Sequence, residues 1–321
     1  MYNNIIATYA AYAKDKSLRM TSSSGAIFPV LARQILSKDG VVYGVALSFD
    51  CRMAEFIRVD NLFNLSRLCG SKYLQAKVGN IYQQVKKDLE IGIKVLFSGV
   101  TCQINGLKSF LKKDYENLFC VDVVCYGVPS PVLWRKYVEQ AEKQNKSRLI
   151  SVNFRCKDKS WMNFGVKKLY ENKNELYISK DKDSFMLMFL RNYCLRPSCY
   201  KCVAKNVKMS DLTIADFWGI EDIAPKMNDD KGISLVIIRT NKGTRLFNSI
   251  KNKLEYKEVS YEEGVRNNSA EYKSVIRPKE RDIFFYDMNK FEFDILQKKY
   301  AVPTTGLFRG IIKQKIKKYF L

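Results

Sequence analysis

The chain has 321 residues, of which 46% are apolar, so it can form one large or two smaller folded units and is too apolar to be disordered. Its net charge of +22, from 55 basic and 33 acidic residues, favours either an anionic partner or a solvated lysine-rich surface. Histidine is absent, so a metal site has to use cysteine or carboxylate ligands. Proton transfer has to use other side chains or a cofactor.

The N-terminus lacks the charged and apolar regions of a signal peptide, and no apolar run approaches the ~20 residues that span a bilayer. We therefore expect a cytoplasmic protein, whose nine cysteines are thiols or metal ligands rather than disulfides. The basic charge comes without a zinc-finger, RRM or homeodomain signature, which argues against a nucleic-acid partner.

Apolar strands alternate with helices in the first half of the chain. The predicted strands are 40–47, 93–97 and 118–125. A first helix is predicted after a serine/glycine turn within 22–37, and further helices at 81–89 and 132–144. Another helix follows the strand at 93–97 and ends at 111. This order predicts an α/β fold with a mixed, mostly parallel sheet and flanking helices. Ligands bind at the carboxyl ends of such strands, where Cys102 and Cys125 lie.

The pattern changes after about residue 148, which predicts a second lobe integrated with the first. Antiparallel strands are expected at 149–155 and 166–170, further strands at 212–215 and 233–239, and helices at 184–192, 240–254 and from 262 onward.

Three cysteines near the middle of the chain carry the strongest chemical signal. Cys194, Cys199 and Cys202 follow the spacing C-x4-C-x2-C, which with one distant cysteine can hold an iron–sulfur cluster. Cys102 is our choice for the fourth ligand and Cys125 is the second choice, because both follow strands. A zinc ion or a 2Fe–2S centre would fit the same spacing.

Two polar loops could contact a phosphorylated or aromatic cofactor. Ser23, Ser24 and Gly25 precede an apolar helix, whose free amides suit a phosphate, although an ordinary serine cap is as good an interpretation. The second loop, 70–75, is GSKYLQ, with a cation and an aromatic ring; a plain surface turn is the alternative.

Two further segments place charges beside aromatic rings. Arg155 and Lys157 lie close to Trp161 and could neutralise a pyrophosphate or a reduced flavin, or could be solvated charges at a strand end. Asp216 follows a short strand and is followed by Phe217 and Trp218, which fits a cofactor pocket or a buried turn.

Taken in order, the segments SSSG, VVYGVAL, GSKYLQ, LFSGVTCQINGLKSFL, VDVVCYGVPSP, FRCK, LRPSCYKC, SDLTIADFWGI and DDKGISLVII resemble the beta-subunit family of coenzyme F420 hydrogenase/dehydrogenase over about residues 20–260. The resemblance implies an FAD-binding oxidoreductase with a 4Fe–4S cluster, which passes electrons between flavin and a ferredoxin-like or deazaflavin-like partner. Many bacterial relatives occur with polysaccharide-biosynthesis enzymes, so a small or sugar-linked substrate is expected.

The resemblance also implies roles and boundaries. It divides the chain into a flavin-binding part (15–95), a cysteine-bearing domain (96–262) and a helical tail (263–321). The expected catalytic residues are Tyr126, Lys157 and Asp216. The expected cofactor contacts are Ser23, Ser24, Gly25, Gly70, Ser71, Lys72, Tyr73, Gln75, Gln103, Arg155, Lys157, Phe217 and Trp218. The expected cluster ligands are Cys102, Cys194, Cys199 and Cys202.

The chain departs from the family pattern in three ways. Thr101 stands where a proline is usual, and Tyr126 stands where a histidine is usual, with a much higher intrinsic pKa. The repeated cysteine motifs of an N-terminal ferredoxin-like domain are missing, so we expect a separate ferredoxin as electron carrier.

The tail from Thr304 predicts a basic amphipathic helix, which could lie on an anionic membrane or pack on its own domain. Two other functions remain open. One is a non-redox accessory protein in glycan assembly whose fold is stabilised by a bound metal; this hypothesis predicts that no flavin is bound. The other is nucleic-acid binding, which rests on charge alone.

Overall fold

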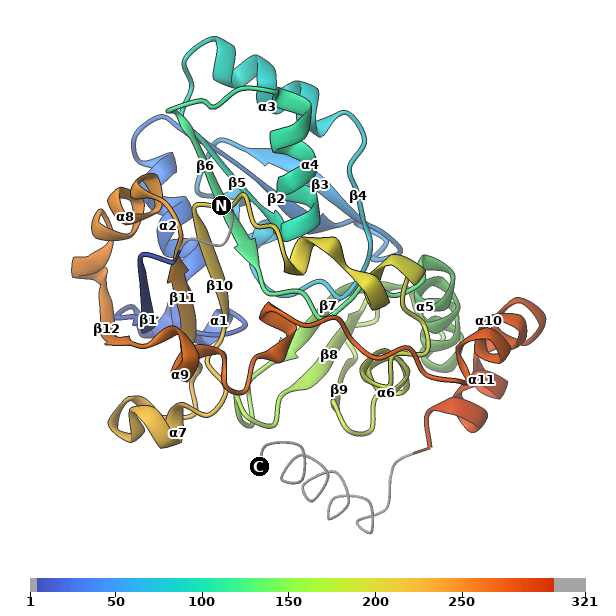
Figure 1. Cartoon of the computed structure of the whole chain (residues 1–321). Helices are drawn as coiled ribbons and strands as arrows, with labels where there is room; N and C mark the ends of the chain where they lie inside the picture. Colours follow the sequence, from blue (N-terminus) through green and yellow to red (C-terminus); the bar gives the residue numbers. More distant parts are fainter. Residues whose placement is uncertain (1–4, 303–321) are drawn as a thin grey trace.

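The computed structural model describes residues 5–302 and contains two sheets with helices around them (Figure 1). The larger, nine-stranded sheet has the order β12-β1-β11-β10-β6-β5-β2-β3-β4. Its strands are β1 (Ala7–Ala13), β2 (Val41–Leu47), β3 (Ala54–Val59), β4 (Ala76–Lys77), β5 (Val95–Val100), β6 (Leu118–Val123), β10 (Leu212–Asp216), β11 (Ser234–Ile238) and β12 (Leu254–Val259). The predicted mixed α/β class is confirmed.

The four central strands, β2, β5, β6 and β10, run parallel to one another, so their carboxyl ends share one edge. They are mainly apolar because helices cover both faces, with polar exceptions such as Asp122 on β6 and Asp216 on β10. One face packs against α2 (Ile27–Leu36) and α8 (Asn241–Asn248). The other packs against α3 (Ile81–Glu90) and α4 (Thr101–Leu111).

The smaller sheet is an antiparallel meander of β7 (Leu149–Cys156), β8 (Gly165–Tyr170) and β9 (Glu175–Ser179). An aromatic-rich core joins it to four helices, α5 (Pro131–Asn145), α6 (Ser184–Leu190), α10 (Arg281–Lys290) and α11 (Phe293–Tyr300). The remaining elements are α1 (Lys16–Thr21), α7 (Ile220–Ile223), α9 (Tyr261–Val265) and six short 3₁₀ segments: η1 (Asn64–Leu68), η2 (Pro197–Lys201), η3 (Val203–Lys205), η4 (Pro225–Met227), η5 (Lys251–Lys253) and η6 (Ser269–Glu271).

The main error in the predicted elements lies at 240–254, where we expected one helix. Helix α8 ends at Asn248, and the chain then enters β12 at Leu254, an edge strand whose side chains are mostly exposed. Strand β1 was not predicted either, because four of its seven residues are alanine, which is depleted in strands. Together these two strands extend the sheet beyond β11.

A buried ion network ties the cysteine-bearing segment to the sheet. The carboxylate of Glu271 accepts hydrogen bonds from Lys208 and from Arg239, whose Nη2 lies 2.5 Å from Glu271 Oε1. Arg239 Nε also donates to Thr213 Oγ1 on β10 at 2.7 Å. The side chains of Glu271, Lys208 and Arg239 are each at most 4% exposed, so these charges depend on one another for solvation.

No helix within 5–302 is long and apolar enough to cross a membrane. The predicted amphipathic segment from Thr304 lies outside the described residues, so its membrane contact stays a prediction.

Replacing Glu271 with Gln leaves two buried cations without a counter-charge, and we expect it to lower the free energy of unfolding by about 3–5 kcal/mol. Urea denaturation measures the change. The control is Glu116→Gln, which breaks an exposed pair with Arg245 and should cost less than about 1 kcal/mol. Equal effects of the two substitutions would contradict this role for Glu271.

Candidate functional site

Chemistry-bearing residues gather at the edge where the central parallel strands end. Cys102 follows β5 in the first turn of α4, and Cys125 lies two residues beyond β6. Asp216 is the last residue of β10, the next strand in the sheet. The sequence placed Cys102 and Cys125 at strand ends, and the sheet order brings these ends together.

Four cysteine thiols converge at this edge: Cys102, Cys125, Cys199 and Cys202. Burial raises the pKa of Cys125 to about 12, and the negative charges of the other three contribute to the increase. The pKa of Cys102 is raised by burial and by the charges of Cys202 and Cys199. The ends of β5 and β6 lie side by side, and η3, which directly follows Cys202, contacts α4, so the four thiols form one group. We call it the cysteine group.

Two cations adjoin the cysteine group. Lys205 Nζ donates to the carbonyl oxygens of Cys125 and Ala270, and its charge acts to lower the pKa of Cys125. Arg196 acts on the pKa of Cys102 in the same way. Positive charge here favours the thiolate forms, which are the forms that bind metals.

Cys194 lies elsewhere. It is 0% exposed and belongs to the aromatic-rich core around α5 and α6. Its carbonyl accepts a hydrogen bond from Ser130 N at 2.8 Å, and burial raises the pKa of its thiol to about 12. The structure therefore separates Cys194 from the two cysteines that follow it in sequence and places Cys125 beside them instead.

A single metal ion is not accommodated by the described side chains: within 5–302 no three Cys, Asp or Glu residues are arranged to hold one. A four-iron cluster needs a wider arrangement, because each thiolate binds its own iron atom.

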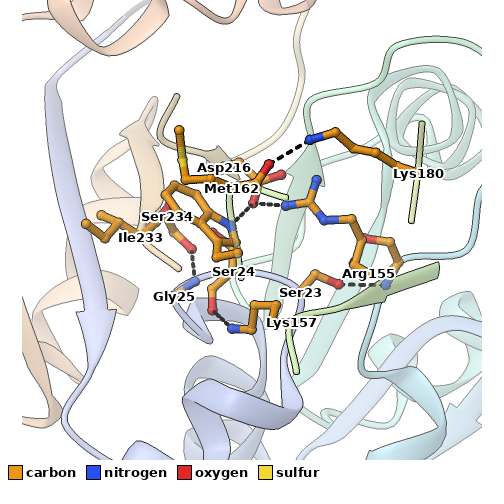
Figure 2. A network of polar contacts seen from close by, with 12 residues as sticks. Ser23, Ser24, Gly25, Arg155, Lys157, Met162, Lys180, Asp216, Ile233 and Ser234 are labelled. Carbon is orange, nitrogen blue, oxygen red and sulfur yellow. Dashed lines mark hydrogen bonds and ion pairs between the residues drawn. The ribbon is translucent and has the colours of Figure 1, made fainter. Parts of the chain in front are cut away.

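The two polar loops meet directly. Ser71 donates from its backbone N to Ser23 Oγ at 2.8 Å and from its hydroxyl at 2.9 Å. Gly25 N donates to Ser234 Oγ, and Ser24 Oγ donates to the carbonyl of Ile233. These two hydrogen bonds hold the first loop against the start of β11 (Figure 2). A Cβ at Gly25 would lie 2.4 Å from the Ala11 carbonyl oxygen, so this position requires glycine.

An arginine faces these loops from β7. Arg155 Nη2 donates to Asp216 Oδ1 at 2.8 Å, and Trp161 Nε1 donates to the same oxygen (Figure 2). Trp161 stacks on Trp218 with ring centroids 5.0 Å apart. Arg155 Nε is buried and has no hydrogen-bond partner among residues 5–302, and its charge opposes the increase that burial causes in the pKa of Tyr73. The guanidinium thus keeps one unused donor beside both polar loops.

The model of one protein family matches residues 92–263, more than half of the chain. That model describes the C-terminal part of the coenzyme F420 hydrogenase/dehydrogenase beta subunit. The chain belongs to this family. The match covers β5, β6, β10 and the whole cysteine group, and it confirms the predicted resemblance. The family makes the chain a redox protein of the F420 hydrogenase beta-subunit type.

The fold is also similar to a chain in a solved structure, the F420-reducing [NiFe] hydrogenase complex from Methanosarcina barkeri. The TM-score is 0.55 at 16% identity, and the alignment covers 93% of this chain and 92% of that one. Identity at this level shows a shared fold. No curated protein matches the chain.

Lys157 holds the first polar loop in place in this family member. Its ammonium donates to three carbonyl oxygens, those of Arg19 at 2.7 Å, Ser24 at 3.1 Å and Lys231 at 2.6 Å. An ammonium has three donors, so all of them are used. In this structure Lys157 therefore positions the first polar loop, and its catalytic role stays a prediction.

Tyr126 connects the two parts of the site by packing. Its hydroxyl donates to the Leu190 carbonyl at 3.0 Å, and its ring lies 5.6 Å from that of Phe189. Phe189 in turn stacks on Tyr73 at 5.3 Å. Since Tyr126 directly follows Cys125, this aromatic row joins the cysteine group to the GSKYLQ loop.

The other predicted contacts have mainly structural partners. Gln103 caps α4 by accepting from Val100 N, and Lys72 donates to the carbonyls of Arg67 and Cys69. Phe217 is fully buried in the core. Gly70 and Gln75 are exposed. Thr101, in place of the family's proline, donates to buried Asp122 at 2.5 Å.

Sequence reasoning missed the cations of the cysteine group. Arg196 lies within the motif, between Cys194 and Cys199, and Lys205 lies three residues after Cys202. A search for basic residues within a few positions of the cysteines would have found both. For Cys125 the signal was present, since it follows a strand as Cys102 does.

The pH dependence of stability tests the placement of Lys157. Burial lowers its pKa from 10.5 to about 8 in the folded chain. Between these two pKa values the unfolded chain binds more protons. The contribution of Lys157 to the free energy of unfolding therefore rises by about 1.4 kcal/mol for each step of one in pH across this range. We expect the free energy of unfolding of wild type, measured by urea denaturation, to rise relative to that of Lys157→Met between pH 8 and pH 10.

Lys226→Met, on an exposed 3₁₀ segment, is the control and should differ from wild type by an amount that pH does not change. A constant difference for Lys157→Met as well would contradict its burial as an ammonium.

Proposed function

We propose that this chain is an iron–sulfur flavoprotein oxidoreductase, with a 4Fe–4S cluster on Cys102, Cys125, Cys199 and Cys202 and FAD against the junction of the two polar loops. The observation that carries the proposal is the convergence of these four thiols at the carboxyl edge of the sheet. Membership of a redox family supports it.

The donor set fits a cluster. Four thiolates are the usual protein ligands of a 4Fe–4S centre. Burial and the charges of neighbouring thiolates raise the pKa values of Cys102 and Cys125, and a bound metal would favour their thiolate forms. Lys205 and Arg196 would offset the remaining negative charge. This ligand set replaces Cys194 of the sequence hypothesis by Cys125.

The polar loops fit a flavin nucleotide. Helix α2 begins at Ile27, and Ala26 at its N-cap has no polar side chain. The amides of Ile27 and Phe28 would therefore be the ones that face a phosphate, because Pro29 has no N–H. Ser23 and Ser71 supply hydroxyls at the same place. The unused Nε of Arg155 would donate to a polar atom of the cofactor.

A flavin exchanges one or two electrons and a cluster exchanges one, so together they join a two-electron substrate to a one-electron carrier. The aromatic row of Tyr73, Phe189 and Tyr126 packs between the two proposed cofactors and excludes water there. From the family resemblance we propose a deazaflavin-like or sugar-linked molecule as the two-electron substrate.

A pair of cysteine substitutions tests the ligand set. We expect Cys125→Ser to lose most of its iron and sulfide, since one thiolate ligand is gone. Cys194→Ser should keep both and show only lower stability, because its thiol fills the apolar core. Iron and sulfide are assayed on protein purified without oxygen. Full iron in Cys125→Ser with loss in Cys194→Ser would restore the sequence hypothesis and refute ours.

A conservative change at Arg155 tests the flavin site. Arg155→Lys keeps the charge but removes Nε, and we expect FAD to bind flavin-depleted protein at least about tenfold more weakly, as a lost charged hydrogen bond implies. Quenching of flavin fluorescence measures the affinity. Arg52→Lys, which alters a pair with Glu142 on α5, is the matched control and should bind like wild type.

A further inference from the structure

A hollow of about 490 Å³ opens beside the cysteine group. Cys202 lines it directly, together with η3 and the segment 272–274. The two walls are joined, because Cys202 N donates to Ser274 Oγ at 2.9 Å. In Figure 1 the yellow chain that carries η2 and η3 passes next to α4, which bears Cys102, and η3 contacts this helix. The hollow is therefore a surface entrance to the proposed cluster.

Apolar side chains are exposed in and beside this hollow. Val203, which lines it, is 80% exposed, and Tyr272 is 37% exposed. Ile276, two residues beyond Ser274, is 84% exposed. Val203 and Ile276 therefore leave branched aliphatic surface exposed on two neighbouring segments.

The charged side chains that line the hollow are all basic. Residues 196–208 and 272–279 contain seven basic residues and no acidic one, of which Arg277 pairs with Asp282 just beyond this range and Lys208 is buried. Lys201, Lys205 and Lys273 line the hollow itself, with Lys201 and Lys273 exposed. The carboxylate of neighbouring Glu271 is buried against Lys208 and Arg239, so it does not offset this charge at the surface.

We infer that this face is the docking surface for a small acidic electron-carrier protein that itself holds an iron–sulfur cluster. The inference rests on the proposed function, since it requires a cluster behind Cys202. Lysines around an apolar centre steer an acidic partner into contact, and the apolar centre then excludes water. Transient redox pairs bury small interfaces, which suits a single hollow.

The exchange at this face moves one electron, with no bond or proton transferred: one of the two clusters is oxidised as the other is reduced. Because Cys202 is both a wall of the hollow and a proposed ligand, a carrier seated there lies directly beside a ligand of the cluster.

A binding experiment tests the inference with a purified bacterial 2[4Fe–4S] ferredoxin as probe. We expect the full chain, purified without oxygen, to bind it at 20 mM salt and to bind about tenfold or more weakly at 200 mM, as charge steering requires. The double charge reversal Lys201→Glu with Lys273→Glu should weaken binding at least about tenfold. Lys38→Glu with Lys226→Glu makes the same change in net charge at exposed positions elsewhere and should bind like wild type.

Equal weakening by both double variants would mean that total charge alone drives binding, and would overturn the inference. Failure of wild type to bind ferredoxin would overturn it too, including a result in which it binds only anionic vesicles or duplex DNA. Iron, sulfide and flavin are assayed on the same samples, so that a failure of the docking inference can be told from a failure of the proposed function. A protein that contains cluster and flavin but does not bind the carrier refutes this inference and leaves the proposed function standing.

Discussion

The shared carboxyl edge of β5, β6 and β10 is the constraint on which the site depends. Parallel strands end side by side, so the loops that leave them converge whatever their distance in sequence. This edge puts Cys102 and Cys125 near each other and places Asp216 one strand further along. The charged network at Glu271 then fastens the segment after the cysteine motif to the same sheet.

The same edge divides the site into two compartments that remain in contact. The polar compartment is fastened by backbone carbonyls, three of which surround Lys157, and it keeps one buried donor on Arg155. The sulfur compartment lies closer to the surface, next to the lysine-lined hollow. Tyr126 and Phe189 pack between them. A flavin in the first and a cluster in the second would have separate access to substrate and carrier.

Sequence reasoning succeeded where local pattern decides structure. The buried strands and amphipathic helices of the first half follow from apolar periodicity, and the strand-end positions of Cys102 and Cys125 follow from them. It could not anticipate the positions that tertiary contacts determine. The spacing of Cys194 from Cys199 fits a ligand motif, but the turn after α6 directs Cys194 into the core. From the sequence alone, Lys157 is interpreted as a cation that is free to contact a cofactor. Only the fold brings the carbonyls of Arg19 and Lys231 to its ammonium group.

The central claim is that the four gathered thiols hold an iron–sulfur cluster in a protein that also binds flavin. The most direct measurement is the iron, sulfide, zinc and flavin content of the full chain purified without oxygen, with its visible spectrum. The account predicts about four irons per chain, matching sulfide, and flavin bands over a broad iron–sulfur absorption. Colourless protein that contains zinc and neither iron nor flavin would contradict it.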